Sequence, residues 1–366
     1  MAIKVGFLLV SNSLRPIPST RIAALNMFPF LRAAMFEPHI VFEPERDTEN
    51  PDVSGVVQRV LGEGFHIVVF QKVRGPSVVE LARQLSAAGI KTLYLVCDRV
   101  DTGMADATDA TVVVTEYLRS LYPLALQSKV HVVHDGIEHP ELHKTEWSNH
   151  AGSRGRPLHA VLVTSIELDC LPVLNSPPEW LEVNIVGAYA PAGQTWQRLR
   201  ELRWRLAAKR GKQERLAYLR FLANRRIRCT AWSPLGVYDL MRQADIGIIP
   251  IDDTSRQSPG IDIPAWKIKS ENRLTMKMSM GLPVVATAVP SYEPVVERGR
   301  NGFLARSQRE WQEFLDALRD PVARQVIGAR ARESVLERYS MREQARRLID
   351  VLHALTRESR FLSPTP

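Results

Sequence analysis

The chain has 366 residues, of which 45% are hydrophobic and 24% charged, and its formal net charge is +8. At about 150 residues per domain, this length predicts two globular domains, and the ordinary composition excludes a disordered, collagen-like or miniature protein. The three cysteines, Cys97, Cys170 and Cys229, are far apart in the sequence. This spacing excludes a disulfide framework and a paired-cysteine metal site, and it favours a reducing compartment.

The apolar runs also exclude common membrane and export signals. Residues 5–10 form the first apolar run, which is too short for the core of a signal peptide. No run reaches the roughly 18 apolar residues that a membrane-spanning helix needs. We therefore expect a cytoplasmic protein, and the basic segment described below adds the expectation of peripheral contact with the inner membrane face.

Strand-like apolar runs alternate with amphipathic stretches from the start of the chain, which predicts an α/β fold with a mostly parallel sheet. The expected strands of the first domain are residues 3–10, 39–42, 67–71, 92–97, 110–115 and 130–133. The expected helices are residues 20–34, 54–61 and 76–88. Together they predict a Rossmann-like domain over residues 1–140.

Residues 141–157 are polar and interrupted by Gly and Pro, and we interpret them as a linker. The alternation then restarts, with expected strands at residues 159–164, 181–186, 227–231, 246–250 and 284–286. This second set predicts another Rossmann-like domain over residues 158–338. We expect the two domains to face each other across a cleft, where ligands meet the carboxyl ends of the strands.

Residues 196–228 are strongly basic, with twelve Lys and Arg against two acidic residues. Leu199, Leu202 and Leu206 recur at helical spacing, so the segment predicts a pair of basic amphipathic helices. A solvated helical face explains this charge, and an anionic membrane surface is the alternative partner. Nucleic acid is not expected, because no recognisable nucleic-acid-binding module accompanies the charge.

The segment around residue 270 combines a helix start with positive charge. Ser270 is a suitable N-cap for a short helix over residues 270–280. Three cations lie within a turn of that start, namely Lys267, Lys269 and Arg273. Free backbone N–H groups, the helix dipole and the cations all favour an anion, which predicts a diphosphate site. A capped helix that exposes basic residues by chance is the alternative.

Four segments resemble glycosyltransferase family 4, whose members have the two-domain GT-B fold. They are GLPVVAT at 281–287, the following stretch at 290–305, VHVVHDGIE at 130–138, and the C-terminal stretch at 337–352. The resemblance implies that residues 339–366 form a terminal helix and tail, and that this helix crosses back onto the first domain.

The resemblance also implies an activity. Such proteins transfer a sugar, with retention of configuration, from a nucleotide-sugar held mainly by the second domain. The acceptor, a glycan, a lipid-linked molecule or a small molecule, is held mainly by the first, and no metal or other cofactor is obligatory. Cations must then neutralise the leaving diphosphate. The expected donor-binding residues are Lys267, Lys269, Ser270, Asn272 and Arg273, with Asn272 placed to bond sugar or ribose hydroxyls.

One departure from the family pattern concerns its paired carboxylates, Glu-x7-Glu. Alignment on Gly281 puts these two positions at Ile268 and Met276. The nearest acid, Glu271, is out of register and is expected to cap the helix. Two hypotheses therefore stay open: a glycosyltransferase of surface-glycan or secondary-metabolite assembly, and a catalytically inactive GT-B subunit that binds or scaffolds an active transferase.

The loop after the first strand, residues 11–21, is expected to line the cleft. Arg15, Ser19 and Arg21 are candidates to meet a phosphate of the donor or of a lipid-linked acceptor. Capping of the following helix is the alternative role for Ser19.

Further candidates follow strands of the first domain, at their carboxyl ends. Lys72 comes after residues 67–71, and Asp98 comes after the strand at 92–97. Asp98 is the candidate for activating or orienting an acceptor hydroxyl, and a loop carboxylate bonded to backbone amides is the alternative. His134 lies beside the hinge and is expected to face the cleft. No metal site is expected from the spacing of the acidic residues.

Overall fold

The computed structural model describes residues 2–174, 176–191, 193, 195–252 and 263–361. The chain divides into two compact units. Unit 1 comprises Met1–Glu138, Arg256–Asn272 and Arg338–Pro366, and unit 2 comprises His139–Ser255 and Arg273–Glu337. This division differs from the predicted one, in which a single domain ran without interruption over residues 158–338.

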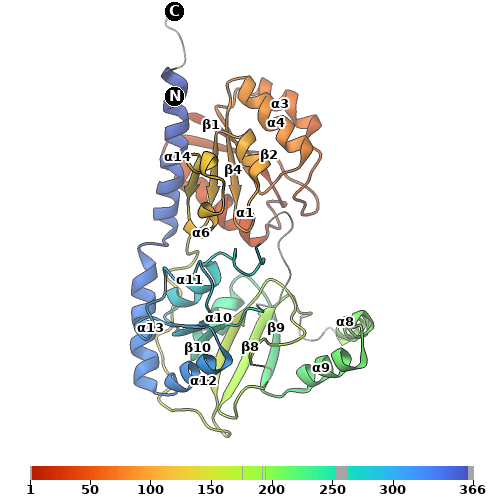
Figure 1. Cartoon of the computed structure of the whole chain (residues 1–366), viewed down its shortest axis with the longest axis vertical. Coiled ribbons are helices and arrows are strands. Elements are labelled where there is room, and N and C mark those ends of the chain that lie inside the picture. Colours follow the sequence, from red (N-terminus) through yellow and green to blue (C-terminus); the bar gives the residue numbers. More distant parts are fainter. Residues whose placement is uncertain (1, 175, 192, 194, 253–262, 362–366) are drawn as a thin grey trace, which may run out of the picture. The chain divides into compact units, whose positions relative to one another are not determined.

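Unit 1 contains a six-stranded parallel sheet in the order β2-β1-β3-β4-β5-β6 (Figure 1). Its strands are β1 (Ile3–Leu9), β2 (Phe36–Phe42), β3 (Ile67–Gln71), β4 (Lys91–Val96), β5 (Ala110–Val113) and β6 (Val130–Val132). The central strand β3 has the sequence IVVFQ and is buried along its whole length. Such continuous apolar strands form the interior of a parallel sheet that is covered on both faces.

Short helices connect these strands. They are α1 (Pro18–Ala23), α2 (Phe28–Ala33), α3 (Val57–Gly62), α4 (Pro76–Ala87), α5 (Thr102–Ala107), α6 (Glu116–Ser120) and α7 (Leu124–Gln127), with 3-10 turns at Leu25–Met27 and Ser54–Val56. The single helix predicted over residues 20–34 was wrong. The chain leaves helical geometry at Ala24, and Pro29 lies in the first turn of α2, where a missing N–H is tolerated.

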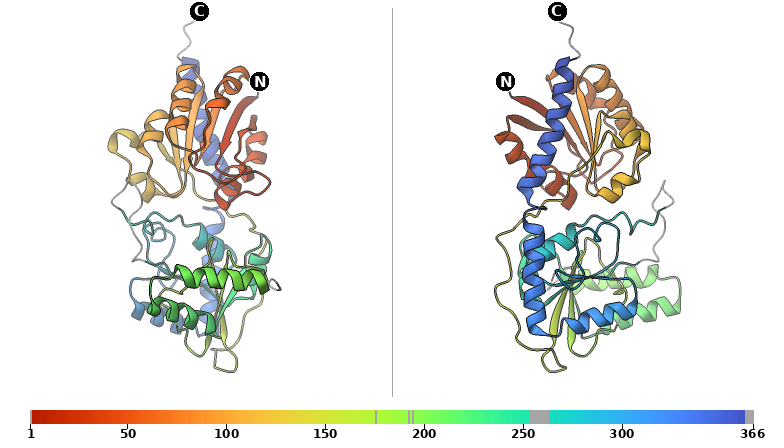
Figure 2. Two further views of the ribbon diagram at one scale, coloured as in Figure 1. Left: turned by 90° about the vertical axis from the view of Figure 1, so that its right-hand side faces the viewer. Right: turned by 60° about the vertical axis from the view of Figure 1, so that its left-hand side comes forward.

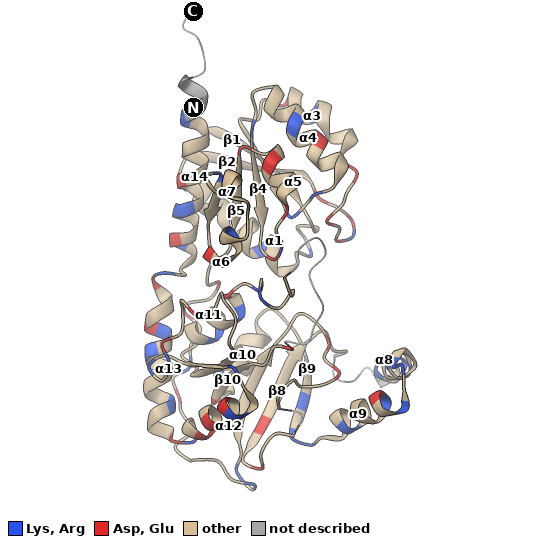
Figure 3. Ribbon diagram, in the orientation of Figure 1, with Lys and Arg blue, Asp and Glu red and all other residues tan. Residues whose placement is uncertain are grey.

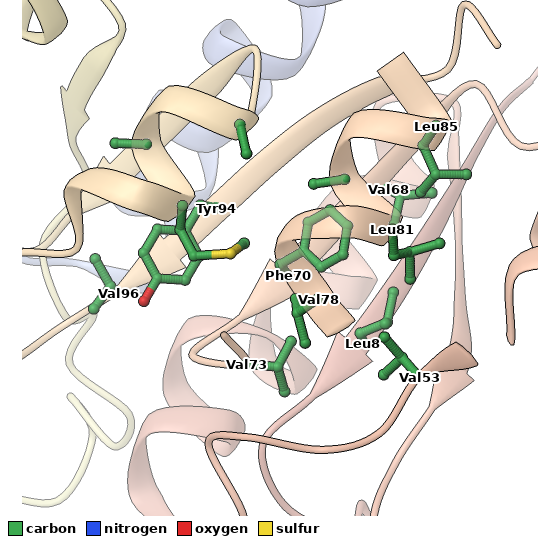
Figure 4. Packing of buried hydrophobic residues seen from close by; sticks show 14 of the residues in the cluster. Leu8, Val53, Val68, Phe70, Val73, Val78, Leu81, Leu85, Tyr94 and Val96 are labelled. Carbon is green, nitrogen blue, oxygen red and sulfur yellow. The ribbon is translucent and has the colours of Figure 1, made fainter. Parts of the chain in front are cut away.

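One face of the unit 1 sheet packs against α3, α4 and α5. Val78, Leu81 and Leu85 of α4 lie in one buried cluster with Val68 and Phe70 of β3 (Figure 4). The three α4 residues recur at helical spacing, so they form a single apolar stripe toward the sheet. This packing fixes the position of β3 and of the loop that follows it.

The opposite face of the same sheet is covered by α1, α2 and the C-terminal helix α14 (Met341–Phe361). Ala345, Leu348, Val351, Leu352 and Leu355 of α14 share a buried cluster with residues of β1, β3 and β4. Figure 2 shows α14 running across this face of the sheet. The expected return of the terminal helix to the first domain is confirmed.

Unit 2 contains a second six-stranded parallel sheet, in the order β12-β11-β10-β7-β8-β9. Its strands are β7 (Leu158–Val163), β8 (Leu181–Gly187), β9 (Ile227–Ala231), β10 (Ile246–Ile249), β11 (Val284–Thr287) and β12 (Phe303–Ala305). Alternate residues of β7 face opposite clusters, with Leu158, Ala160 and Leu162 on one side and Val161 and Val163 on the other.

The helices that cover this sheet are α8 (Thr195–Ala208), α9 (Lys212–Ala223), α10 (Gly236–Gln243), α11 (Asn272–Ser279), α12 (Gln308–Ala317) and α13 (Pro321–Leu336). The predicted basic helix pair is confirmed as α8 and α9. Helix α13 makes a close approach, because a Cβ added at Gly328 would lie 2.1 Å from the carbonyl oxygen of Gly281. Only glycine permits that contact.

The packing of α14 generates a stability prediction. Leu352 is fully buried, so Leu352→Ala should lower the free energy of unfolding of unit 1 by about 2–5 kcal/mol. Val322→Ala is the matched control, because Val322 is 65% exposed and its truncation should change stability by no more than about 0.5 kcal/mol. Urea unfolding measures both, and equal midpoints in the two variants would contradict the packing of α14.

Candidate functional site

Polar residues gather where the strands of unit 1 end. Lys72 follows β3, Asp98 follows β4, and His134 and Asp135 follow β6. The carboxyl ends of parallel strands meet at one edge of a sheet, which is the usual place for ligand-contacting groups. This edge also receives residues 263–272, which group with unit 1; we call them the connecting segment because they lead into α11, most of which belongs to unit 2.

Ile268 anchors the connecting segment in unit 1. It is 3% exposed and belongs to the buried cluster formed with α4, α5 and the strands. Burial of an isoleucine side chain is worth about 1.5–3 kcal/mol. The residue at the first expected carboxylate position therefore has a packing function.

His134 and Glu271 form a buried contact. The Nδ1 atom of His134 is 2.5 Å from Oε1 of Glu271 and 2.8 Å from the carbonyl oxygen of Val114. A carbonyl oxygen can only accept, so Nδ1 carries the proton and donates toward both oxygens. The side chains of His134 and Glu271 are only 6% and 1% exposed. The expectation that Glu271 caps the helix was wrong, because its carboxyl group is buried against the histidine.

Asp135 is also buried, and its environment disfavours ionisation. Burial raises the pKa of Asp135 to about 7, and the nearby carboxylates of Glu271 and Asp98 act in the same direction. A hydrogen bond from the Ser270 side chain opposes this effect. Ser270 was predicted to cap the helix, but α11 begins at Asn272. Its hydroxyl bonds to Asp135 instead.

Lys72 and Asp98 form an ion pair at the same edge. The Nζ atom of Lys72 is 3.0 Å from the Asp98 carboxylate and 3.6 Å from Oε1 of Glu49. Burial lowers the pKa of Lys72, but Cys97, Asp98 and Glu49 together raise it above its usual value, so the ammonium stays charged. The backbone of Lys72 is left-handed, with φ 58°. Asp98 is thus held by a fixed cation while 45% of its side chain remains exposed.

The three candidate residues from the loop after β1, Arg15, Ser19 and Arg21, have different surroundings. Nε and Nη2 of Arg21 donate to the two carboxylate oxygens of Glu138 at 2.7 and 2.9 Å. This bidentate pair gives Arg21 a structural role within unit 1. Arg15 is exposed. Ser19 does not cap α1, because the N-cap residue is Ile17 and no side chain caps the helix there.

The start of α11 carries the remaining candidates. Nη2 of Arg273 donates to Oγ of Ser165, just beyond the carboxyl end of β7, at 3.2 Å. Lys269 is exposed, and Lys267 lies over the ring of Trp266 at 5.3 Å from its centroid. Asn272 is the first residue of the helix. The segment thus brings its cations to a helix N-terminus, as an anion site requires.

Sequence reasoning missed Lys277, one turn after Arg273. It is fully buried, and its Nζ atom donates to the carbonyl oxygen of Arg273 at 3.2 Å. Burial, together with the charge of Arg273, lowers the pKa of Lys277 to about 7. The available signal was its place in an otherwise apolar helical stripe, with Leu274 and Met278 on either side.

Comparison with known proteins identifies the fold. Residues 191–323 match the family model of group 1 glycosyl transferases. HepE from Anabaena, crystallised with UDP-glucose, is 14% identical with a TM-score of 0.64, and the match covers 96% of this chain and 100% of that one. A glycosyltransferase from Rickettsia africae is 11% identical with a TM-score of 0.65, covering 97% and 98%. Among curated proteins, none matches this sequence.

Sucrose-phosphate synthase from Thermosynechococcus elongatus is a further structural match, with 12% identity, a TM-score of 0.63 and coverage of 98% and 100%. The chain therefore has the GT-B fold of glycosyltransferases, as expected from its sequence, and it carries a region that matches group 1 glycosyl transferases.

Within residues 2–174, 176–191, 193, 195–252 and 263–361, no three His, Cys, Asp or Glu side chains are grouped as a metal ion would require. No helix in this described part of the chain is long and apolar enough to cross a membrane.

The burial of Asp135 predicts a pH dependence. Its folded-state pKa of about 7 lies above the ordinary value of 3.8, so the folded state holds its proton more tightly than the unfolded chain. This contribution to stability is full below pH 3.8 and is lost as the pH rises through 7. From pH 5 to 8, the unfolding free energy of Asp135→Asn should therefore gain about 1–3 kcal/mol relative to that of the wild type.

Urea unfolding at each pH measures this difference. Asp350→Asn is the control, since Asp350 is on the surface of α14 and its side chain is 62% exposed. A wild-type protein and an Asp135→Asn variant with parallel pH profiles would contradict the buried, proton-holding state.

Proposed function

We propose that the protein is a glycosyltransferase that moves a sugar from a nucleotide-sugar donor to an acceptor hydroxyl. The observation that carries this proposal is the cationic start of α11, which lies inside the region that matches group 1 glycosyl transferases. The fold supports it, because HepE, with the same fold, was crystallised with UDP and with UDP-glucose.

The donor diphosphate is proposed to bind at the first turn of α11. The first backbone N–H groups of a helix have no partner within the helix, and the helix dipole favours negative charge there. Lys267, Lys269 and Arg273 add positive charge that stabilises the diphosphate as it leaves. In this proposal these groups take the role of a metal ion, so transfer needs no metal.

The acceptor is proposed to bind at the carboxyl edge of the unit 1 sheet. Asp98 orients the acceptor hydroxyl, and its ion pair with Lys72 keeps the carboxylate in place. The bond from the anomeric carbon to the diphosphate breaks, the acceptor oxygen takes its place, and the acceptor proton passes to the leaving diphosphate. Retention of configuration, and a glycan, a lipid-linked molecule or a small molecule as acceptor, follow from the family 4 resemblance.

The second candidate function is a catalytically inactive subunit that binds the nucleotide and supports an active transferase. Apolar residues at both carboxylate positions, Ile268 and Met276, favour it. Asn272 is then the nearest side chain for the ribose or sugar hydroxyls. Turnover of a panel of nucleotide-sugars with candidate acceptors separates the two, since the subunit binds a nucleotide without transfer to any acceptor.

The donor site predicts a loss of affinity in Lys269→Ala. Removal of one charge-assisted contact to phosphate should weaken UDP or GDP binding by about 1–3 kcal/mol, which is roughly 5- to 150-fold. Calorimetric titration measures this, and Lys212→Ala on the exposed side of α9 is the control with unchanged affinity. Equal affinities in the wild type and Lys269→Ala would argue against the assigned site.

We also propose that α8 and α9 contact an anionic membrane surface, at the inner face of the membrane of the cell. Leu202 and Leu206 of α8 pack into unit 2, while Trp196 and Trp204 are 86% and 71% exposed on the outer side. Lys and Arg residues lie along both helices (Figure 3). A helix face that only contacts water does not explain exposed tryptophans. The headgroup region of a lipid membrane accommodates both the indole rings and the cations.

This surface predicts sedimentation with vesicles that contain phosphatidylserine, and release as salt rises. The double variant Trp196→Ser/Trp204→Ser should lose most of the binding, while Leu14→Ser/Leu124→Ser, at two exposed residues of unit 1, should keep it. Binding that is absent in the wild type, or independent of salt, would remove the membrane from the list of partners.

A further inference from the structure

Two side-chain hydrogen bonds join consecutive residues after β6 to consecutive residues of the connecting segment. His134 donates to Glu271 at 2.5 Å, and Ser270 bonds to the Asp135 carboxyl group. All four residues belong to unit 1. The two bonds join stretches that are more than a hundred residues apart in the sequence, the separation from His134 to Glu271 being 137.

The residues after β6 are themselves held in place by α14 and the turn before it. The backbone N–H of His134 donates to Oε1 of Gln344 at 2.9 Å, and Gln344 is fully buried. The ring of His134 meets the ring of Tyr339 edge-on, with centroids 5.0 Å apart. A Cβ on Gly136 would lie 2.8 Å from Sδ of Met341, so this backbone packs closely against the start of α14. His134 and Asp135 are therefore a rigid support.

The connecting segment is attached to unit 1 at three points within four residues, two of them on this support. Ile268 is buried in the core, Ser270 bonds to Asp135, and Glu271 bonds to His134. Lys269 lies between two anchored neighbours and is exposed. Anchoring its neighbours restricts the directions that the Lys269 side chain can take, and it fixes the residues that immediately precede α11.

The burial of a carboxyl group here calls for an explanation other than stability. The Oε2 atom of Glu271 is buried and has no hydrogen-bond partner among the described residues. A buried acceptor without a donor lowers the free energy of unfolding. A protein with an apolar residue in its place would often be at least as stable. A buried polar contact of this kind contributes a specific arrangement, since only one register of the segment brings Glu271 to the histidine.

We propose that His134 and Asp135 are positioning residues that hold the connecting segment so that its cations and the first turn of α11 are preorganised for a diphosphate. The predicted effect on nucleotide affinity rests on the proposed function. The attachment of the connecting segment does not, because it is a property of unit 1. Preorganisation raises affinity because the ligand does not have to order the segment when it binds.

The test uses the full chain and compares two readouts in each variant. Glu271→Leu removes the acceptor with little change in size, and His134→Ala removes the donor. In both, amide hydrogen exchange of residues 263–272, measured without ligand by mass spectrometry, should speed up by roughly ten-fold, and UDP affinity measured by calorimetry should fall by roughly ten-fold. His134→Asn retains an N–H near the position of Nδ1, so it should stay close to the wild type in both readouts.

Two matched variants separate positioning from direct contact. Lys269→Ala should lower UDP affinity while leaving exchange of residues 263–272 unchanged. Glu293→Gln, at an exposed ion pair with Arg306, should change neither readout. Circular dichroism verifies that each variant is folded, and Glu271→Leu with His134→Asn keeps the test decisive if His134→Ala does not fold.

The outcomes are distinguishable. Unchanged exchange in Glu271→Leu would overturn the attachment, and faster exchange with unchanged UDP affinity would overturn the positioning role. Equal effects of His134→Asn and His134→Ala would also contradict it, because the hydrogen bond would then not be what matters. A wild-type protein that binds no nucleotide would reject the proposed function, while the exchange experiment would still decide the attachment.

Discussion

A carboxyl group that is almost completely buried must find a hydrogen-bond donor, and Glu271 finds it in His134, at the end of a strand of unit 1. This requirement determines where the connecting segment lies. The segment packs with unit 1 through Ile268, Ser270 and Glu271, although it leads directly into α11, most of which belongs to unit 2. The position of the cations before α11 follows from this one contact and its neighbours.

The same edge of the sheet explains the electrostatics of the candidate site. Parallel strands end together, so the side chains that follow them are brought close whatever their charge. Burial raises the pKa of Asp135 to about 7, and the carboxylates of Glu271 and Asp98 act in the same direction. Lys72 balances part of this negative charge through its ion pair with Asp98. The edge thus combines the accessible carboxylate of Asp98, the two buried carboxyl groups of Asp135 and Glu271, and the fixed ammonium of Lys72, a set suited to orienting hydroxyls.

Much of the fold could be predicted from the sequence, because buried parallel strands and amphipathic helices leave local patterns. The two sheets and the helix pair α8–α9 have such patterns, whereas the return of α14 to unit 1 was expected from the resemblance to glycosyltransferase family 4. The site was less predictable. Glu271 and Ser270 satisfy local rules for a helix start, but their actual partners lie far away in the sequence, so local reasoning assigned them to capping. The alternative capping role of Ser19 was wrong for a related reason, since the chain enters α1 at Ile17 with Pro18 in the first turn.

The most direct test of the account is a crystal structure of the full chain with a bound nucleoside diphosphate. The account predicts diphosphate oxygens at about 3 Å from backbone N–H groups in the first turn of α11, with Lys269 or Arg273 beside them and the contact between His134 and Glu271 intact. A diphosphate bound away from α11, with Lys267, Lys269 and Arg273 all directed elsewhere, would contradict it.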